Sequence, residues 1–197
     1  MELSIMNELF ISEQAINKAG QIVYVKVFFN YEKLKEALEF NLLPSIISIE
    51  VYLVDKNRFR DSLFAQMILK ESSTSATIKI IDLISSCESF GNASIMLDYL
   101  LKTMTKTEEF LSRDGYNIRL DRIYGTLSNM DKEQNWKKSV PFYQNFVFKN
   151  LINPTTKYNL TFNLYYNGQK STIEDFIKTA ETGYFEYLVT EKKNHFP

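Results

Sequence analysis

The chain has 197 residues, of which 45% are hydrophobic and 24% are charged, and this length and composition fit a globular domain with a substantial core. Its 23 basic and 24 acidic residues give a formal net charge of -1, so no basic footprint for a nucleic-acid backbone is expected. The single cysteine, Cys87, excludes an internal disulfide and suggests a small buried side chain in a reducing cytoplasm.

The first ten residues, MELSIMNELF, contain no basic residue ahead of an apolar run, so they do not look like a signal peptide. No apolar run reaches the roughly 18 residues that a membrane-spanning helix needs. We therefore expect a soluble, cytoplasmic protein that does not bind membranes.

In the first half of the chain, apolar periodicity predicts helices between strands. An apolar stripe over residues 4–20, with Gly20 at its end, predicts a helix. The elements that follow are predicted as a strand at 22–30, a helix at 31–40 that stops before Pro44, strands at 45–54 and 59–72 around a polar turn, and a strand at 76–86 with apolar residues on both faces. The spacing within 59–72 also permits a helix.

In the second half, leucines and a methionine at three- and four-residue steps predict a long amphipathic helix over 91–116. A helix at 137–148 must hold Pro141 in or near its first turn, and Ser171 with Glu174 has the spacing of a capping box. The remaining predictions are strands at 121–128, 158–166 and 183–191, a polar stretch at 129–136 and a helix at 171–181. Together these elements predict an α/β or α+β layer architecture.

The segment ESFGNASIMLDYLL, residues 88–101, places a glycine turn between a strand and a helix. Such a turn presents unpaired backbone N–H groups and the positive end of the helix dipole, which together suit a phosphate group. Gly91 would let the backbone approach the phosphate, Ala93 is small enough not to block it, and the amides from Phe90 to Ser94 would bind. A plain glycine turn before a helix is the alternative interpretation.

In a second segment, IYGTLSNMDKEQNWKKSVPFYQNFVF, a predicted strand is followed by a polar loop and then by a helix that contains Phe-Tyr. With residues 88–101 it resembles the GNAT superfamily of acyl-CoA-dependent N-acyltransferases, over about residues 76–148. The chain departs from the family at Glu88, where Arg or Gln is usual, and at Val147, where Gly usually precedes the phenylalanine.

The resemblance implies a mixed, mostly antiparallel central sheet flanked by helices in a single domain, residues 1–197. In that domain 76–148 would form the acyl-CoA-binding core, and 149–197 the C-terminal strands and helix. It implies an N-acetyltransferase that uses acetyl-CoA as cosubstrate and moves the acetyl group to an amine of an unidentified acceptor by direct attack. Tyr143 would protonate the leaving thiolate, and a backbone N–H near Ile84 or Ser85 would polarise the carbonyl. The residues implied for acetyl-CoA binding are Ile84, Ser85, Phe90, Gly91, Asn92, Ala93 and Ser94.

Other interpretations remain open at this point. The chain is alternatively a catalytically inactive GNAT-like binding or assembly module, or an unrelated α/β interaction protein. Candidate bases for the incoming amine are Glu50, Asp82 and Asp131, whereas His195 lies in the terminal tail and no spacing of metal ligands appears. The acceptor is a small-molecule or protein amine selected by residues 31–60, and two copies of the chain could pair through the last strand.

Overall fold

The computed structural model describes residues 11–55, 58–70, 74–85, 91–127, 136–152, 156–179 and 183–192. Within these ranges the side chains of 55, 58–60, 136, 148–152 and 179 are not described. The chain divides into two compact units, Met1–Arg119 (unit 1) and Leu120–Pro197 (unit 2), and each is described by itself. Five residues singled out above lie outside the described residues: Cys87, Glu88, Phe90, Asp131 and His195.

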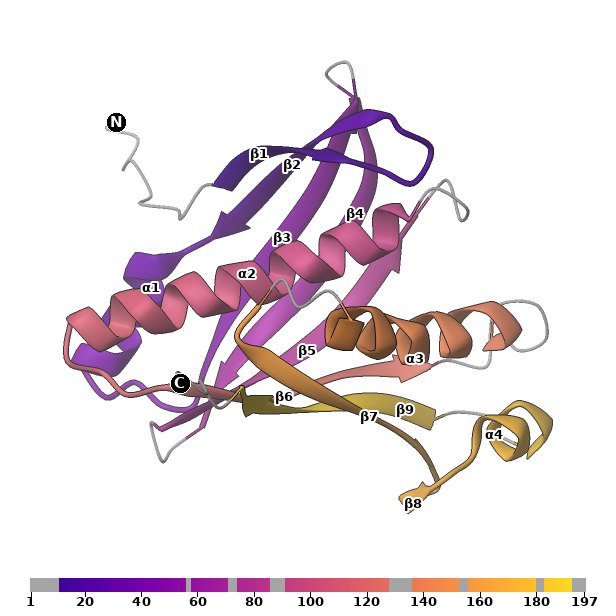
Figure 1. Ribbon diagram of the computed structural model, residues 1–197. Coiled ribbons are helices and arrows are strands. Elements are labelled where there is room, and N and C mark those ends of the chain that lie inside the picture. The colour runs from indigo at the N-terminus through magenta and orange to yellow at the C-terminus, as the bar shows by residue number, and fades with distance from the viewer. Residues whose placement is uncertain are drawn as a thin grey trace, which may run out of the picture. The chain divides into compact units, whose positions relative to one another are not determined.

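Unit 1 contains an antiparallel sheet in which each strand pairs with the next one in the sequence (Figure 1). Its strands are β1 (Ile11–Ile16), β2 (Ile22–Phe29), β3 (Ser45–Asp55), β4 (Arg58–Leu69) and β5 (Ser75–Ile84). The strands predicted at 22–30, 45–54, 59–72 and 76–86 are therefore confirmed, and the helical alternative for 59–72 is wrong. Burial of both faces in β5 is limited to its first half, since Ile81 and Ile84 are about half exposed.

Alternation in β2, β3 and β4, interrupted by a register shift at Leu53 and Val54, builds one buried face of this sheet. The odd-numbered positions are buried, with Val25, Val27, Ile49, Val51 and Leu63 at 0% exposure, while their even-numbered neighbours are half-buried or exposed. The long helix α2 (Asn92–Arg113) contacts β2, β3 and β4 (Figure 1) and buries an apolar stripe. The helix predicted at 91–116 is confirmed.

The short helix α1 (Tyr31–Glu39) confirms the prediction at 31–40. It begins at Asn30, whose side-chain oxygen accepts a hydrogen bond from the Lys33 amide at 2.8 Å, as an N-cap residue does. Its side chains reach the far end of α2, where Tyr31 donates to Asp114 at 3.3 Å and Lys35 pairs with it at 3.1 Å.

The helix predicted at 4–20 is wrong within the described residues, where β1 pairs with β2 as a hairpin. The Asn17 side chain accepts hydrogen bonds from the amides of Ala19 and Gln21, both at 3.0 Å, and Gly20 has φ +76°. Gly20 thus closes a hairpin turn, not a helix. The apolar stripe was misleading because residues 11–16 hydrogen-bond to β2 instead of forming the hydrogen bonds of a helix.

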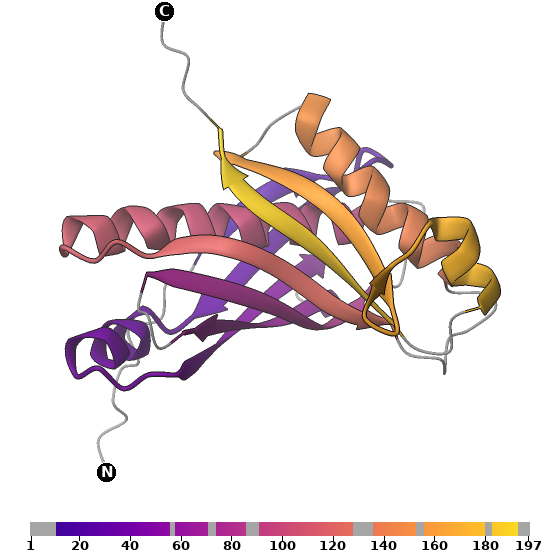
Figure 2. The same ribbon diagram turned by 90° about the horizontal axis from the view of Figure 1, so that it is seen from below.

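Unit 2 contains a second antiparallel arrangement, in which β9 lies between β6 and β7, and β8 follows β7. The strands are β6 (Arg119–Leu127), β7 (Tyr158–Tyr166), β8 (Gln169–Lys170) and β9 (Gly183–Glu191), and the helices are α3 (Trp136–Ile152) and α4 (Ile173–Thr179). Helix α3 packs on β7 and contacts α4 (Figure 2). The strands predicted at 121–128, 158–166 and 183–191 are confirmed.

The helices predicted at 137–148 and 171–181 are confirmed as α3 and α4, with starts that differ by one and two residues. Helix α3 begins at Trp136, so Pro141 lies in its second turn and provides no N–H for the carbonyl four residues earlier. Helix α4 is capped by Thr172, whose hydroxyl oxygen accepts from the Asp175 amide at 3.1 Å, one residue later than the predicted Ser171–Glu174 box.

Helices therefore flank mostly antiparallel strands, as predicted for the fold class. Across the described ranges, no helix combines the length and hydrophobicity needed to cross a lipid bilayer. The described His, Cys, Asp and Glu side chains include no group of three or more that could hold a metal ion.

Candidate functional site

Gly91 forms the turn into α2 in the left-handed conformation, with φ +76° and ψ +13°. Its carbonyl accepts the first helical hydrogen bond, from the Ile95 amide at 3.2 Å. A Cβ atom at this position would lie 2.9 Å from Cγ of Lys18. Both the backbone conformation and the available space therefore favour glycine at residue 91.

The first turn of α2 supplies the amides predicted to hold a phosphate. The N–H groups of Asn92, Ala93 and Ser94 have no carbonyl acceptor inside the helix, because they precede its first hydrogen bond. The helix has 22 residues and no acidic residue in this first turn. Its aligned peptide dipoles thus give the start of α2 a partial positive charge.

Lys18 adds a full positive charge beside this turn, and sequence reasoning did not identify it. It lies in the β1–β2 turn. The Cγ, Cδ and Cε atoms of its side chain lie 2.9, 3.1 and 3.3 Å, respectively, from the position that a Cβ on Gly91 would occupy. The Lys18 side chain is exposed. No local signal links Lys18 to Gly91, because the two meet only after the hairpin has folded against the start of α2.

A buried polar network holds the hairpin turn and α2 together. Asn92 donates from Nδ2 to the Asp61 carboxylate at 2.6 Å, and Asn17 donates to Asn92 Oδ1 at 3.4 Å. Asn17, Asp61 and Asn92 are 5%, 1% and 5% exposed. The Asn92 side chain is therefore directed into unit 1, so only its backbone amide is available for a ligand at the turn.

The end of β5 reaches the same network. Ser85 donates to Asp61 at 3.5 Å, and Ile84, which aligns with Ser62 of β4, is 49% exposed. Unit 1 therefore brings the described residues of the predicted acetyl-CoA set, at 84–85 and 91–94, into the region around Asp61. Asp61 itself was predicted only as part of a strand, and its burial opposite Asn92 has no counterpart in the sequence pattern.

Tyr143, the predicted acid, lies on α3 in unit 2 and is 7% exposed. Its ring stacks on Phe185 with centroids 3.9 Å apart and planes at 20°. Its backbone carbonyl accepts a hydrogen bond from the Tyr187 hydroxyl at 2.9 Å. Tyr143 is thus held in one orientation by β9, and its role as an acid stays a prediction.

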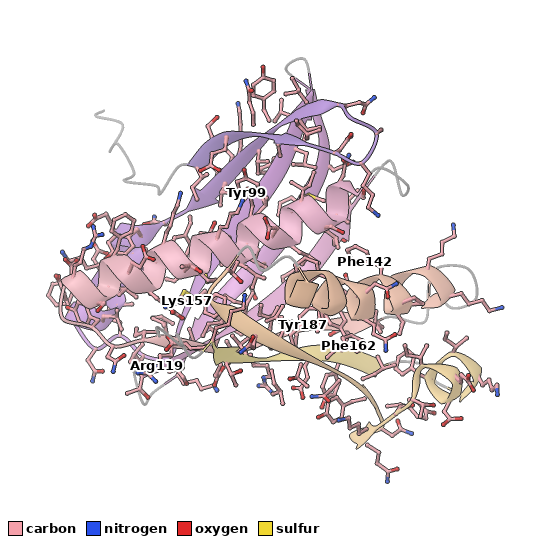
Figure 3. The ribbon with its side chains drawn as sticks, in the orientation of Figure 1. Tyr99, Arg119, Phe142, Lys157, Phe162 and Tyr187 are labelled. Atoms are coloured by element: carbon pink, nitrogen blue, oxygen red, sulfur yellow. The ribbon has the colours of Figure 1, made fainter. Side chains whose placement is uncertain are left out.

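An aromatic cluster surrounds Tyr143 within unit 2. Figure 3 labels Phe142 on α3, Phe162 on β7 and Tyr187 on β9, and the Phe162 and Tyr187 ring centroids are 5.8 Å apart. Phe146 belongs to the core with 7% exposure, whereas Phe142 is half-buried. Burial holds the pKa of Tyr187 well above its usual value, so this hydroxyl stays protonated and keeps donating to the α3 backbone.

The carboxylates proposed as bases have different surroundings. Glu50 is half-buried on β3 and accepts a hydrogen bond from the Tyr52 hydroxyl at 2.7 Å. Burial, together with this bond to Glu50, raises the pKa of Tyr52 to about 12. Asp82 is exposed on β5 and accepts from the neighbouring Leu83 amide at 2.8 Å.

Comparison with known proteins adds two structural similarities. No protein-family model matches the sequence, and no curated protein matches it. One is to a crystal structure of an aminoglycoside 6'-N-acetyltransferase complexed with coenzyme A. The match covers 79% of this chain and 78% of the acetyltransferase chain, with 16% sequence identity and a TM-score of 0.34. Another is to the crystal structure of a GNAT family acetyltransferase from Elizabethkingia anophelis with acetyl-CoA bound. This match covers 80% of this chain and 83% of that chain, with 11% sequence identity and a TM-score of 0.33. Because both TM-scores are below 0.5, the assignment of a function rests on the residues described above.

Proposed function

We propose that this chain is an N-acetyltransferase that moves an acetyl group from acetyl-CoA to an amine. The observation that carries the proposal is the turn at Gly91, where left-handed backbone, the amides of a 22-residue helix and the Lys18 side chain meet. Residues 1–197 would act as one catalytic domain, with 76–148 as the acyl-CoA-binding core.

The residues at this turn suit the pyrophosphate of an acyl-CoA. The amides of Asn92, Ala93 and Ser94 would donate to phosphate oxygens, and the Lys18 ammonium would offset their negative charge. The buried Asp61 carboxylate accepts a hydrogen bond from the Asn92 side chain at 2.6 Å, which offsets part of its negative charge.

The reaction requires little further chemistry from the protein. Acetyl-CoA supplies a thioester, which an uncharged amine attacks at the carbonyl carbon; the C–N bond forms, the C–S bond breaks and the amine loses one proton. A backbone N–H at the end of β5, near Ile84 or Ser85, would donate to the carbonyl oxygen as negative charge develops there. The Tyr143 phenol would give its proton to the leaving thiolate.

Binding can be tested by thermal denaturation of the full chain in acetyl-CoA. A ligand of the folded state at 100 times its Kd stabilises by about 2.7 kcal/mol, which corresponds to roughly 5–10 °C for a chain of this length. A melting temperature that does not change at millimolar acetyl-CoA would refute the proposal and leave the inactive binding or assembly module and the unrelated interaction protein.

Turnover can be tested by the release of free thiol in the presence of candidate amines. Tyr143→Phe should lower the rate by about 10²-fold or more with little change in acetyl-CoA affinity. Tyr166→Phe, on β7, is the matched control and should leave the rate unchanged. An equal rate in Tyr143→Phe would remove this tyrosine from the mechanism.

The burial of Tyr143 against Phe185 favours a second candidate function, a GNAT-like binding or assembly module without catalysis. A phenol with this little exposure contributes to packing, and it can reach a leaving group only if the thioester is bound directly beside it. This alternative predicts no thiol release with any amine tested, whether or not acetyl-CoA binds.

A further inference from the structure

Three aromatic rings gather on the face of the unit 1 sheet that is not part of its buried core. Phe28, Tyr52 and Phe64 occupy even-numbered positions on β2, β3 and β4, and each is half-buried. The Tyr52 ring makes T-shaped contacts with Phe28 and with Phe64, at centroid distances of 5.8 Å in both cases. These rings form a continuous aromatic surface across the three strands.

A carboxylate lies within this aromatic surface. The strand register aligns Glu50 with Phe28 on one side and Phe64 on the other, so both cross-strand neighbours of the charge are phenylalanines. Directly opposed side chains on one face lie about 4.5–5.5 Å apart at Cβ. Among the described residues, Glu50 accepts a hydrogen bond from Tyr52 at 2.7 Å, and a carboxylate can accept up to about four.

The arrangement differs from that of a carboxylate paired for stability on a sheet. No lysine or arginine is aligned directly with Glu50, although Lys26 lies diagonally across from it on β2. Lys26 aligns with Tyr52, and Lys79 aligns with Gln66. Asp82, which aligns with Phe64, extends the row that contains Glu50 and adds a second negative charge to it.

A carboxylate bordered by aromatic faces has the chemistry that recognises an organic ammonium ion. The ammonium gains charge-assisted hydrogen bonds from the carboxylate and attraction to the negative faces of the rings. Its alkyl chain gains apolar contact with the same rings. Lys79, at the border, would repel a peptide that carries several positive charges and leave a small monocation favoured.

We propose that Phe28, Glu50, Tyr52 and Phe64, together the Glu50 patch, bind the ammonium group of a small alkylamine, the acceptor of the acetyl group. This inference rests on the proposed function for the acceptor role, but binding at the patch does not require acetyl-CoA. Glu50 acts here as a recognition group for the protonated amine on its arrival.

Binding of n-butylammonium to the full chain, followed by NMR through the aromatic ring signals, tests the proposal. Glu50→Gln should weaken binding at least tenfold, because it removes the charge while keeping the shape. Phe64→Leu should weaken it about two- to fivefold through the lost ring face. Glu36→Gln, an exposed glutamate on α1, is the control and should bind as the wild type does.

Two ligand comparisons keep the test decisive even if the Glu50→Gln variant does not fold. The uncharged analogue n-butanol should bind at least tenfold more weakly than n-butylammonium, and a lysine-rich peptide should not bind more tightly. Equal binding of the alcohol, tighter binding of the peptide, or unchanged affinity in folded Glu50→Gln would each overturn the Glu50 patch. If the patch binds amine but acetyl-CoA does not bind the chain, the proposed function fails and the patch stands; the reverse result refutes the patch alone.

Discussion

Replacing Gly91 by alanine separates the two reasons for a glycine at this turn. With φ at +76°, a residue that carries a Cβ costs roughly 1–2 kcal/mol, partly offset by about 0.4–1 kcal/mol from the less flexible unfolded chain. The new methyl group would also lie 2.9 Å from Cγ of Lys18, whose flexible side chain must then move away from the turn. We expect a net loss of about 1 kcal/mol in the free energy of unfolding.

The same substitution should impair binding of acetyl-CoA. Displacing Lys18 and narrowing the approach to the α2 amides should weaken the affinity by at least about fivefold, or about 1 kcal/mol. Urea denaturation measures the stability loss, and isothermal titration calorimetry of the full chain with acetyl-CoA measures the affinity.

Gly115, at the other end of α2, provides the matched control. Its φ is +88°, and nothing lies within 4 Å of the position that a Cβ would occupy. Gly115→Ala should therefore lose similar stability but keep the affinity of the wild type for acetyl-CoA. An equal loss of affinity in both variants, or none in Gly91→Ala, would refute the reasoning about the turn.

Three further substitutions test parts of the account. Lys18→Met should weaken acetyl-CoA binding about two- to fivefold, as expected for an exposed charge, without changing stability measured in urea; a change in stability alone would contradict it. Asn92→Ala should destabilise the chain by about 1.5–3 kcal/mol in urea, because it removes a hydrogen bond to the buried Asp61 carboxylate, and wild-type stability would show that other groups hold Asp61. Tyr187→Phe should lower the free energy of unfolding by about 1 kcal/mol, because the hydrogen bond to the Tyr143 carbonyl is lost. A larger fall in the rate of thiol release than in acetyl-CoA affinity would show that Tyr187 orients Tyr143.

The regular elements could be predicted because their sequence patterns are local. In the middle of β3 and β4, apolar Ile49, Val51 and Leu63 alternate with polar Ser48, Glu50 and Ser62, and this local alternation indicates which face is buried. The long apolar stripe of α2, closed by Gly115, likewise requires no knowledge of the tertiary structure.

The errors occurred where two segments compete for the same backbone groups. The apolar residues of 11–16 fit a helical stripe as well as a strand, so their pairing with β2 could not be seen from periodicity, and Gly20 fits a hairpin turn as well as a helix end.

The candidate site was predictable only in part. The glycine turn before α2 follows from its own residues, but the approach of Lys18 and the burial of Asp61 depend on contacts between distant segments. Tyr143 was correctly placed on a helix, whereas its stacking on Phe185 is set by a strand that follows much later in the chain.

The central claim, that the start of α2 binds an acyl-CoA, is tested most directly by mapping backbone amide chemical shifts during a titration with acetyl-CoA. The account predicts saturable changes that are largest at Gly91, Asn92, Ala93 and Ser94. Saturable changes confined to other parts of the chain, or none at millimolar concentration, would contradict it.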